Sequence, residues 1–187
     1  MDPTNKSFQR RQSLRLPEFD YSEPGAYFVT IVTQNRKILF GNVINGEMIL
    51  NEIGTMVKEV IEEIPQEYHG INVEVFGVMP NHIHILLLIS EVVAGPCACH
   101  KNGQPQGVDP TKNRLSLPEI VHRFKSLTTH RYMVNVKEKG WSRFEKRLWQ
   151  RNYHEHIIRN ERDYQAIYDY ILANPLNWEK DKEFYTS

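Results

Sequence analysis

The sequence predicts an α+β fold, with an antiparallel sheet of four or five strands in the order βαββαβ. Two observations favour this fold. Short runs of β-branched and aromatic residues alternate with longer segments whose apolar residues recur every three or four positions. The chain of 187 residues shows no repeat and no shift in composition, which indicates one domain. We place this domain at residues 25–178.

A strand and a hairpin are expected after a polar N-terminal arm. Residues 1–24 show no helical or strand period, and we expect an extended arm there. Gly25 opens the first strand, residues 26–33, which is rich in β-branched and aromatic residues. Asn45-Gly46 then stands between apolar residues, a strong signal for a tight hairpin.

A helix and two paired strands follow the hairpin. Asn51 can cap a helix that runs to Ile64, and Pro65 is expected to end it. Residues 71–78 alternate as a strand, and Met79-Pro80-Asn81 is a tight connection into residues 82–89. These two strands should therefore pair antiparallel.

The second half is predicted as a loop, a helix, a strand and a last helix. Residues 91–115 are rich in Gly and Pro and indicate a long mobile loop. A capping box predicts a helix over residues 116–131, on the same sheet face as the helix 51–64. A strand is expected around residues 148–158, and residues 160–174 form the last helix, ended by Pro175. The order is ferredoxin-like (RRM-like), with a C-terminal helix added and a tail at 179–187.

Charge and composition restrict the possible environment. Lys+Arg and Asp+Glu both number 23, but residues 119–151 hold nine basic side chains against three acidic ones, so an anionic partner remains possible. No apolar run is long enough to span a membrane and no signal peptide is visible, so we expect a cytoplasmic protein without a membrane partner. Cys97 and Cys99 are too close for an ordinary disulfide, and with His100 they lack a fourth zinc ligand.

Two histidines interrupt the strand at residues 82–89. His82 and His84 share one face of the strand, while Ile83 points to the other face. This spacing suits two ligands of one metal ion. Two hydrogen-bonded structural histidines are the alternative, and the spacing by itself favours that alternative.

The last helix offers three tyrosines. Its apolar stripe, which we expect to pack in the core, contains Tyr164, Ile167, Tyr168, Ile171 and Leu172. Tyr170 falls about 120° from the centre of this stripe, and Asn174 stands one turn further along on the same flank. In isolation, this would indicate only a surface tyrosine and a helix-ending asparagine.

Three elements in this order resemble the IS200-like single-tyrosine HUH transposases, most closely the REP-associated tyrosine transposases. Pro80-Asn81-His82-Ile83-His84 resembles the Pro-x-His-hydrophobic-His element of the family. Trp149-Gln150-Arg151 with Glu155-His156 and Ile158-Arg159 resembles its Trp-x-Arg and acidic-His-x-Ile-Arg stretch. Tyr170 with Asn174-Pro175 resembles the nucleophile helix, although better-known members have glutamine where this chain has Asn174.

The resemblance implies an enzyme that cleaves and rejoins single-stranded DNA near hairpins through a 5′-phosphotyrosine. Tyr170 would be the nucleophile, and His82, His84 and Asn174 would hold Mg²⁺ or Mn²⁺. The partner would be a DNA hairpin like those of REP repeats, bound by a monomer or a homodimer. The expected DNA-binding residues are Arg10, Arg11, Arg15, Arg123, Lys125, Arg151, His156 and Arg159.

Other interpretations remain open at this point. A DNA-binding protein of the same fold could have lost strand transfer, and a metal-dependent hydrolase could use the histidines and water; the joint presence of His82, His84, Tyr170 and Asn174 argues against both. Trp141, Phe144 and Trp149, among basic residues, could stack on bases or form an edge of the core. His154-Glu155-His156 is a second His-x-His, for which we expect a structural or DNA-contacting role.

Overall fold

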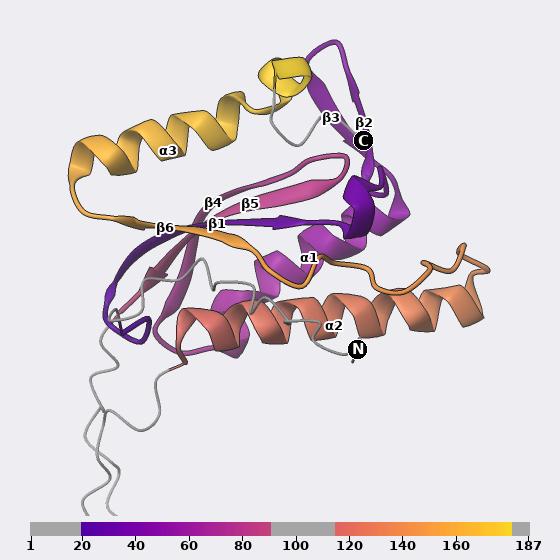
Figure 1. Ribbon diagram of the computed structural model, residues 1–187, viewed down its shortest axis with the longest axis horizontal. Helices are drawn as coiled ribbons and strands as arrows, with labels where there is room; N and C mark the ends of the chain where they lie inside the picture. The colour runs from indigo at the N-terminus through magenta and orange to yellow at the C-terminus, as the bar shows by residue number, and fades with distance from the viewer. Residues whose placement is uncertain (1–19, 91–114, 181–187) are drawn as a thin grey trace, which may run out of the picture.

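A four-stranded antiparallel sheet forms the centre of the computed structural model, which describes residues 20–90 and 115–180. The strands are β1 (Gly25–Val32), β4 (Ile71–Val78), β5 (His82–Ile89) and β6 (His154–Ile158). Their order across the sheet is β4-β5-β1-β6, and every neighbouring pair is antiparallel (Figure 1). The predicted α+β fold and βαββαβ order are confirmed. Arg10, Arg11, Arg15, Cys97, Cys99 and most of the expected arm and loop lie outside the described residues.

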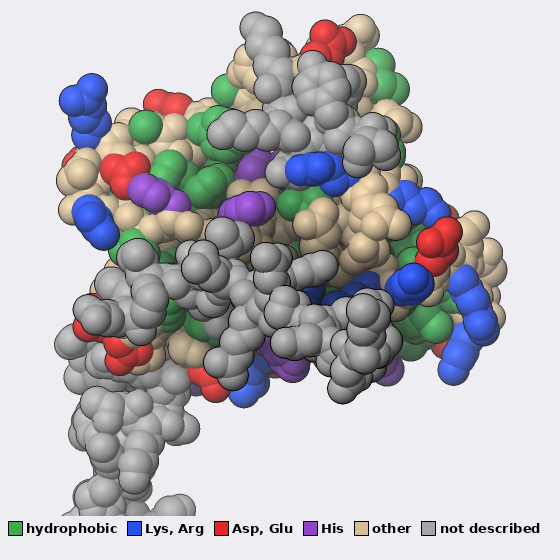
Figure 2. All heavy atoms as spheres, viewed as in Figure 1, with side chains coloured by type: hydrophobic (Ala, Val, Ile, Leu, Met, Phe, Trp, Pro, Cys, Tyr) green, Lys and Arg blue, Asp and Glu red, His purple; other side chains and the backbone are tan. Residues whose placement is uncertain are grey.

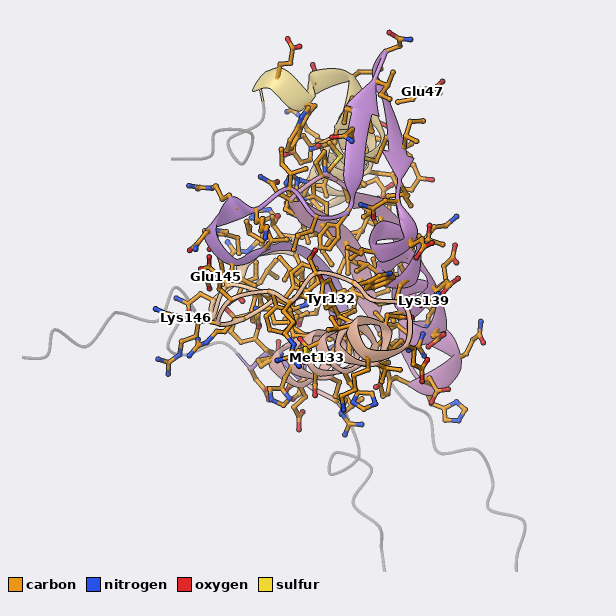
Figure 3. The ribbon with its side chains drawn as sticks, turned by 90° about the vertical axis from the view of Figure 1, so that its right-hand side faces the viewer. Glu47, Tyr132, Met133, Lys139, Glu145 and Lys146 are labelled. Carbon is orange, nitrogen blue, oxygen red and sulfur yellow. The ribbon has the colours of Figure 1, made fainter. Side chains whose placement is uncertain are left out.

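The predicted hairpin forms a separate two-stranded sheet inserted after β1. Its strands are β2 (Gly41–Ile44) and β3 (Glu47–Leu50). Asn45 and Gly46 have φ angles of 54° and 79°, the left-handed backbone that the tight turn requires. Figure 3 shows this hairpin projecting beyond the main sheet, with Glu47 at its outer end.

Helix α1 (Glu52–Glu67) begins as predicted and ends later. The Asn51 side chain accepts a hydrogen bond from the Gly54 amide at 2.9 Å, as an N-cap should. Pro65 lies inside the helix instead of ending it. A proline in the last turn removes only one backbone donor, and the Tyr68 amide still bonds to the Ile64 carbonyl at 3.0 Å.

Helix α2 (Leu117–Glu138) is two turns longer than predicted. The capping box is confirmed, because the Ser116 amide donates to Glu119 Oε2 at 2.8 Å. No glycine or proline interrupts the sequence between Arg131 and Gly140, and Tyr132 in the added turns is buried. Burial of this face stabilises turns beyond the predicted end of the helix.

The expected strand at residues 148–158 is wrong in its first half. Strand β6 begins only at His154, and Trp149 makes an isolated bridge with Thr33. Lys125 explains the break, because its Nζ lies 3.0–3.4 Å from the carbonyl oxygens of residues 150–152. These carbonyls therefore bond to a side chain rather than to a neighbouring strand.

The sheet separates two layers. Helices α1 and α2 cover one face as predicted, and α3 (Glu161–Ala173) lies across the other face, followed by the 3-10 helix η3 (Pro175–Lys180) (Figure 1). The main core lies between the sheet and α1 and α2, and a smaller cluster joins α3 to the sheet through Val75, Leu86 and Ile171. Among the described residues, no helix is both long and apolar enough to cross a membrane.

Candidate active site

The two histidines of β5 lie side by side on the sheet face under α3. Alternation along β5 places Ile83 and Ile85 in the main core and turns His82 and His84 to the opposite face. Their Nε2 atoms are 2.9 Å apart. The two residues are 0% and 3% exposed, so the pair is buried.

His82 is held in a defined orientation by Asn81. The Asn81 Nδ2 donates to the backbone carbonyl of Arg36 at 3.2 Å, and this contact directs Oδ1 to Nδ1 of His82 at 2.9 Å. Because an amide oxygen only accepts, Nδ1 of His82 has the proton and Nε2 has a lone pair. Burial lowers the pKa of His82 to about 3, so the ring is neutral at neutral pH.

His84 contacts a residue of the neighbouring strand. Thr30 of β1 lies directly opposite His84 in the sheet, and its Oγ1 is 2.8 Å from His84 Nδ1. The ring of Phe28, also on β1, stacks on His84 with the centroids 5.3 Å apart. Both ring nitrogens of His84 therefore have polar neighbours, Thr30 and His82.

Tyr170 of α3 reaches the histidine pair, as the family resemblance implies. Its Oη lies 3.4 Å from Nε2 of His84, and its ring meets His84 and Phe28 edge-on. The residue is 44% exposed, so a phosphate could approach the phenol from solvent. The tyrosine predicted as nucleophile is thus the one that lies next to the histidines.

Asn174 lies in the segment that crosses the histidines. It is 2% exposed and stands between Tyr170, which contacts His84, and Trp178, whose ring is 5.8 Å from the His82 ring. Tyr170, Asn174 and Trp178 are spaced four residues apart in the sequence. Its position agrees with a third ligand, and that role stays a prediction.

The apolar stripe of α3 is only partly buried. Ile171 packs fully against the sheet, whereas Tyr164 and Tyr168 are half-buried and Leu172 is exposed. The Tyr164 hydroxyl donates to Glu74 at 3.2 Å, and burial is the main cause that raises the Tyr164 pKa. Tyr164 and Tyr168 are not core residues as predicted, because α3 covers the sheet from one side and nothing among the described residues packs over it.

The donor set fits a divalent cation with open coordination positions. The two Nε2 atoms are 2.9 Å apart, close enough for a single ion to bind both. The described residues contain no group of three His, Cys, Asp or Glu side chains that could enclose a metal ion. Two imidazoles and an amide leave room for water and phosphate oxygens, which Mg²⁺ and Mn²⁺ favour.

The basic residues predicted for DNA binding do not form one cluster. Lys125 is half-buried against the carbonyls of residues 150–152, and its ammonium stands 5.4 Å from the centre of the Tyr153 ring. Arg123 is exposed on the layer opposite Tyr170, over the ring of Tyr68. Arg151 lies within the segment that Lys125 holds, and its side chain is exposed. DNA contact by Arg123 and Arg151 stays a prediction, whereas the carbonyl contacts of Lys125 favour a structural role for that residue.

His156 and Arg159 lie on the edge strand and the turn into α3. His156 shares the sheet face of the histidine pair, opposite Phe28, and its Nε2 is 2.8 Å from Asp163 Oδ2. His156 and Arg159 line a hollow of about 290 Å³, together with Tyr21, Asn160 and Asp163. Histidine side chains gather on the face seen in Figure 2, with Lys and Arg on both sides.

The aromatic residues of the basic stretch form an edge of the core. Trp149 is buried, and its Nε1 donates to Thr128 at 2.8 Å. Trp141 and Phe144 pack edge-on against the buried ring of Tyr132. Of the two interpretations of this stretch, core packing is therefore the one that the contacts support.

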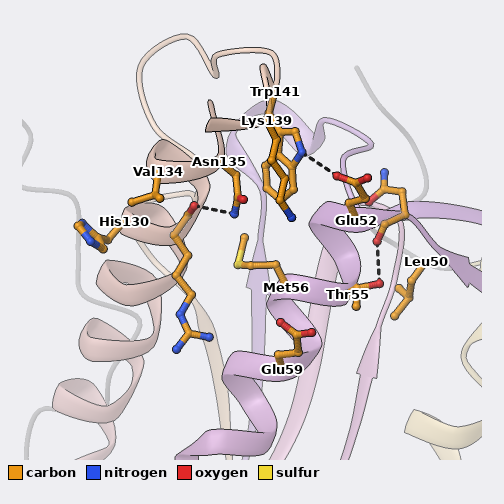
Figure 4. Close-up of a pocket in the computed structure, with 12 residues that line it drawn as sticks. Leu50, Glu52, Thr55, Met56, Glu59, His130, Val134, Asn135, Lys139 and Trp141 are labelled. Carbon is orange, nitrogen blue, oxygen red and sulfur yellow. Dashed lines mark hydrogen bonds between the residues drawn. The ribbon is translucent and has the colours of Figure 1, made fainter. Parts of the chain in front are cut away.

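A larger pocket lies elsewhere, between the start of α1 and the end of α2. It measures about 680 Å³, and Trp141 donates to Glu52 across it at 3.0 Å (Figure 4). None of the predicted site residues lines it. The candidate site is therefore the smaller, buried arrangement under α3.

Four residues around the histidines were not predicted to act there. Thr30 and Phe28 reach the site through the pairing of β1 with β5, and the sequence does not give that register. Asn81 was interpreted only as a turn residue and part of a motif. Trp178 follows Pro175, where the prediction ended the helix.

Two relatives are similar to the chain over most of its length. No family model matches the sequence. An uncharacterized protein of Haemophilus influenzae is 36% identical over 181 residues, which cover 95% of both chains. A second protein of the same species, described as a "Putative REP-associated tyrosine transposase", is 28% identical over 159 residues, 84% of this chain and 73% of that protein.

A solved structure of a REP-associated tyrosine transposase bound to a REP hairpin has the same fold. Its TM-score is 0.55 at 20% sequence identity, with 91% of this chain and 76% of that chain covered. Fold and relatives define a protein of the transposase class. Both findings support the IS200-like family, in the branch of the REP-associated tyrosine transposases.

Proposed function

We propose that the protein is a metal-dependent DNA transposase that cleaves and rejoins single-stranded DNA near hairpins. The main support is the position of Tyr170, whose Oη lies 3.4 Å from Nε2 of His84 in the histidine pair. Tyr170 is the one tyrosine of α3 with a described contact to His84, and it is accessible from solvent. Membership of the family supports a transposase-like activity.

The reaction exchanges one phosphodiester for another. Tyr170 Oη, after losing its proton, attacks the scissile phosphorus, and the bond from phosphorus to the 3′ oxygen breaks. That oxygen leaves as a free 3′-hydroxyl with a proton, and the 5′ phosphate stays on the tyrosine. A second 3′-hydroxyl can attack the phosphotyrosine and reseal the strand without ATP, because the bond energy is retained.

We assign His82 and His84 as ligands of a divalent cation, with Asn174 as the third. The cation would offset the negative charge of the nonbridging phosphate oxygens, which otherwise repels a nucleophile. The protein contributes rigidity, because Asn81 and Thr30 hold the two rings and β5 is paired on both sides. Trp178 and Tyr170 cover the rings and limit the access of water.

The DNA partner would be a single strand that contains a hairpin. The solved relative binds a REP hairpin, and this chain has its exposed Arg151, His156 and Arg159 at or near β6. The arginines of the arm, Arg10, Arg11 and Arg15, would add phosphate contacts. Phosphate contacts give affinity, and base contacts near the hairpin would give sequence preference.

The first test is a search for covalent protein–DNA adducts. Labelled hairpin DNA with Mn²⁺ should give a denaturation-resistant band with the native protein and none with Tyr170→Phe, which loses one oxygen and little packing. Tyr168→Phe is the matched control on the same helix and should keep the adduct. His82→Gln and His84→Gln should lose it too, and glutamine avoids the cavity that alanine would leave in this buried site.

Three outcomes would contradict the proposal. An adduct on Tyr168 or Tyr164, located by mass spectrometry, would refute the assignment of the nucleophile. Cleavage with no adduct in the native protein would indicate a hydrolase that uses water. Hairpin binding with neither adduct nor cleavage would indicate a DNA-binding protein that has lost strand transfer.

A further inference from the structure

We propose that Thr30 is a positioning residue that lets His84 change tautomer when a divalent cation binds. His82 keeps the same tautomer with and without the cation. This inference rests on the proposed function, because it concerns the cation site of that reaction. It assigns a role to a buried hydroxyl that does not contact DNA or the reacting phosphate. Thr30 reaches His84 from β1 because the two residues face each other in the sheet.

The tautomer of His82 is fixed by contacts that cannot reverse. The Arg36 carbonyl only accepts, so the amide nitrogen of Asn81 must face it and the amide oxygen must face His82. The amide oxygen also only accepts, so His82 Nδ1 has the proton. The lone pair of His82 Nε2 then points at His84 with or without a cation.

The tautomer of His84 follows from that of His82. Two Nε2 atoms 2.9 Å apart need one proton between them, and His82 does not supply it. In the cation-free protein, His84 Nε2 therefore donates to His82. The Nδ1 of a neutral His84 then has a lone pair, and the Thr30 hydroxyl donates to it at 2.8 Å.

A shared cation reverses this arrangement at His84 alone. Both Nε2 atoms would then have to present lone pairs, so His84 would release its Nε2 proton to solvent and take one from solvent on Nδ1, and its net charge would not change. Thr30 must now accept instead of donate. A hydroxyl can do both by rotating about one C–O bond, whereas an amide oxygen or a carboxylate can only accept.

Thr30 should matter more with the cation bound than without it. An imidazole bound to a cation takes on part of its charge, so its Nδ1–H makes a charge-assisted hydrogen bond, about twice as strong as a neutral one. Thr30→Val keeps the shape and removes the hydroxyl. Loss of such a supporting group typically weakens metal binding by about 10–100-fold.

The experiment reads tautomers directly. Nitrogen-15 NMR of the histidine rings, at a pH of about 8 where free imidazole is neutral, should show the proton on Nδ1 of His82 and on Nε2 of His84. Addition of Zn²⁺, a diamagnetic probe that imidazole binds well, should move the His84 proton to Nδ1 and leave His82 unchanged. Calorimetric titration with Mn²⁺ should then give about tenfold weaker binding for Thr30→Val and near-native binding for Thr30→Ser.

Thr55→Val is the matched control, because the Thr55 hydroxyl bonds to the Asn51 carbonyl on α1, in the layer opposite Tyr170. It should bind Mn²⁺ like the native protein. If the native protein binds cations but the His84 proton stays on Nε2, or Thr30→Val binds equally well, this inference is wrong and the proposed function stands. If the native protein binds neither cation, the metal site of the proposed function fails, and the inference fails with it.

Discussion

At the residue scale, a side chain's contacts decide between functions that its type leaves open. Lys125 and Arg151 are both basic and close in space, yet Lys125 is half-buried against three carbonyls and Arg151 is exposed. His82 and His156 are both histidines on the same sheet face, yet His82 is buried beside Asn81, whereas His156 is exposed and pairs with Asp163. Composition predicts a set of candidates, and burial separates structural members from accessible ones.

Lys125→Met should destabilise the fold and leave DNA binding almost unchanged. It removes charged hydrogen bonds to the carbonyls of residues 150–152, worth about 1–3 kcal/mol at a half-buried position. Urea denaturation should show a lower midpoint with the same slope. Arg123→Gln, on the exposed part of the same helix, should change stability by less than about 0.5 kcal/mol. A native midpoint with a weaker salt dependence of DNA binding would make Lys125 a DNA contact after all.

At the element scale, α3 packs on the sheet through a smaller apolar cluster than α1 and α2 do, although it holds the candidate nucleophile. It packs on the sheet through the small cluster around Ile171, whereas α1 and α2 share the main core. The helical period predicted correctly that Tyr170 and Asn174 share a flank. It did not show which stripe residues would be covered, because that depends on how the helix lies across β4 and β5.

Ile171→Ala should loosen α3 and reduce adduct formation together. Ile171 is fully buried against the sheet, and its truncation should cost about 2–4 kcal/mol of unfolding free energy. The neighbouring Leu172 is 57% exposed, and Leu172→Ala should cost less than about 0.5 kcal/mol. Urea denaturation and adduct yield measure the two effects. Equal losses for the two variants would mean that α3 is held by contacts other than this cluster.

The sequence predicted elements better than it predicted contacts between them. Asn51, Ser116 and the Asn45-Gly46 turn mark local boundaries, because capping and turn geometry depend on nearby residues. The contact of Thr30 with His84 joins residues 54 positions apart and depends on strand register. Register follows from the packing of the whole sheet, so no local pattern contains it.

At the scale of the whole molecule, the proposed DNA contacts combine the face near β6 with the N-terminal arm. The net charge is zero, so a general attraction of the protein for DNA cannot account for binding. Local contacts with phosphates must therefore supply the affinity for DNA, and each contact releases counterions from the DNA. The salt dependence of affinity therefore reflects how many phosphates the protein neutralises.

Affinity for a single-stranded hairpin should fall steeply with salt, and a chain without residues 1–15 should show a shallower fall. The slope of log affinity against log salt should decrease by about one for each phosphate that the shortened chain no longer neutralises. Lys58→Gln, which removes an exposed cation paired with Glu62 on α1, is the control and should leave the slope unchanged. Fluorescence anisotropy at several salt concentrations measures both. Equal slopes for the full and shortened chains would exclude Arg10, Arg11 and Arg15 as phosphate-binding residues.

The strand order has a consequence for the synthesis of the protein. β1 is made first but lies between β5 and β6, and the site needs Thr30, His84 and Tyr170 together. Contacts so distant along the chain form late in folding, and the last strand and helix leave the ribosome near the end of translation. A nascent chain that already contains both histidines still lacks its nucleophile. An incompletely translated copy could bind DNA without being able to cut it through Tyr170.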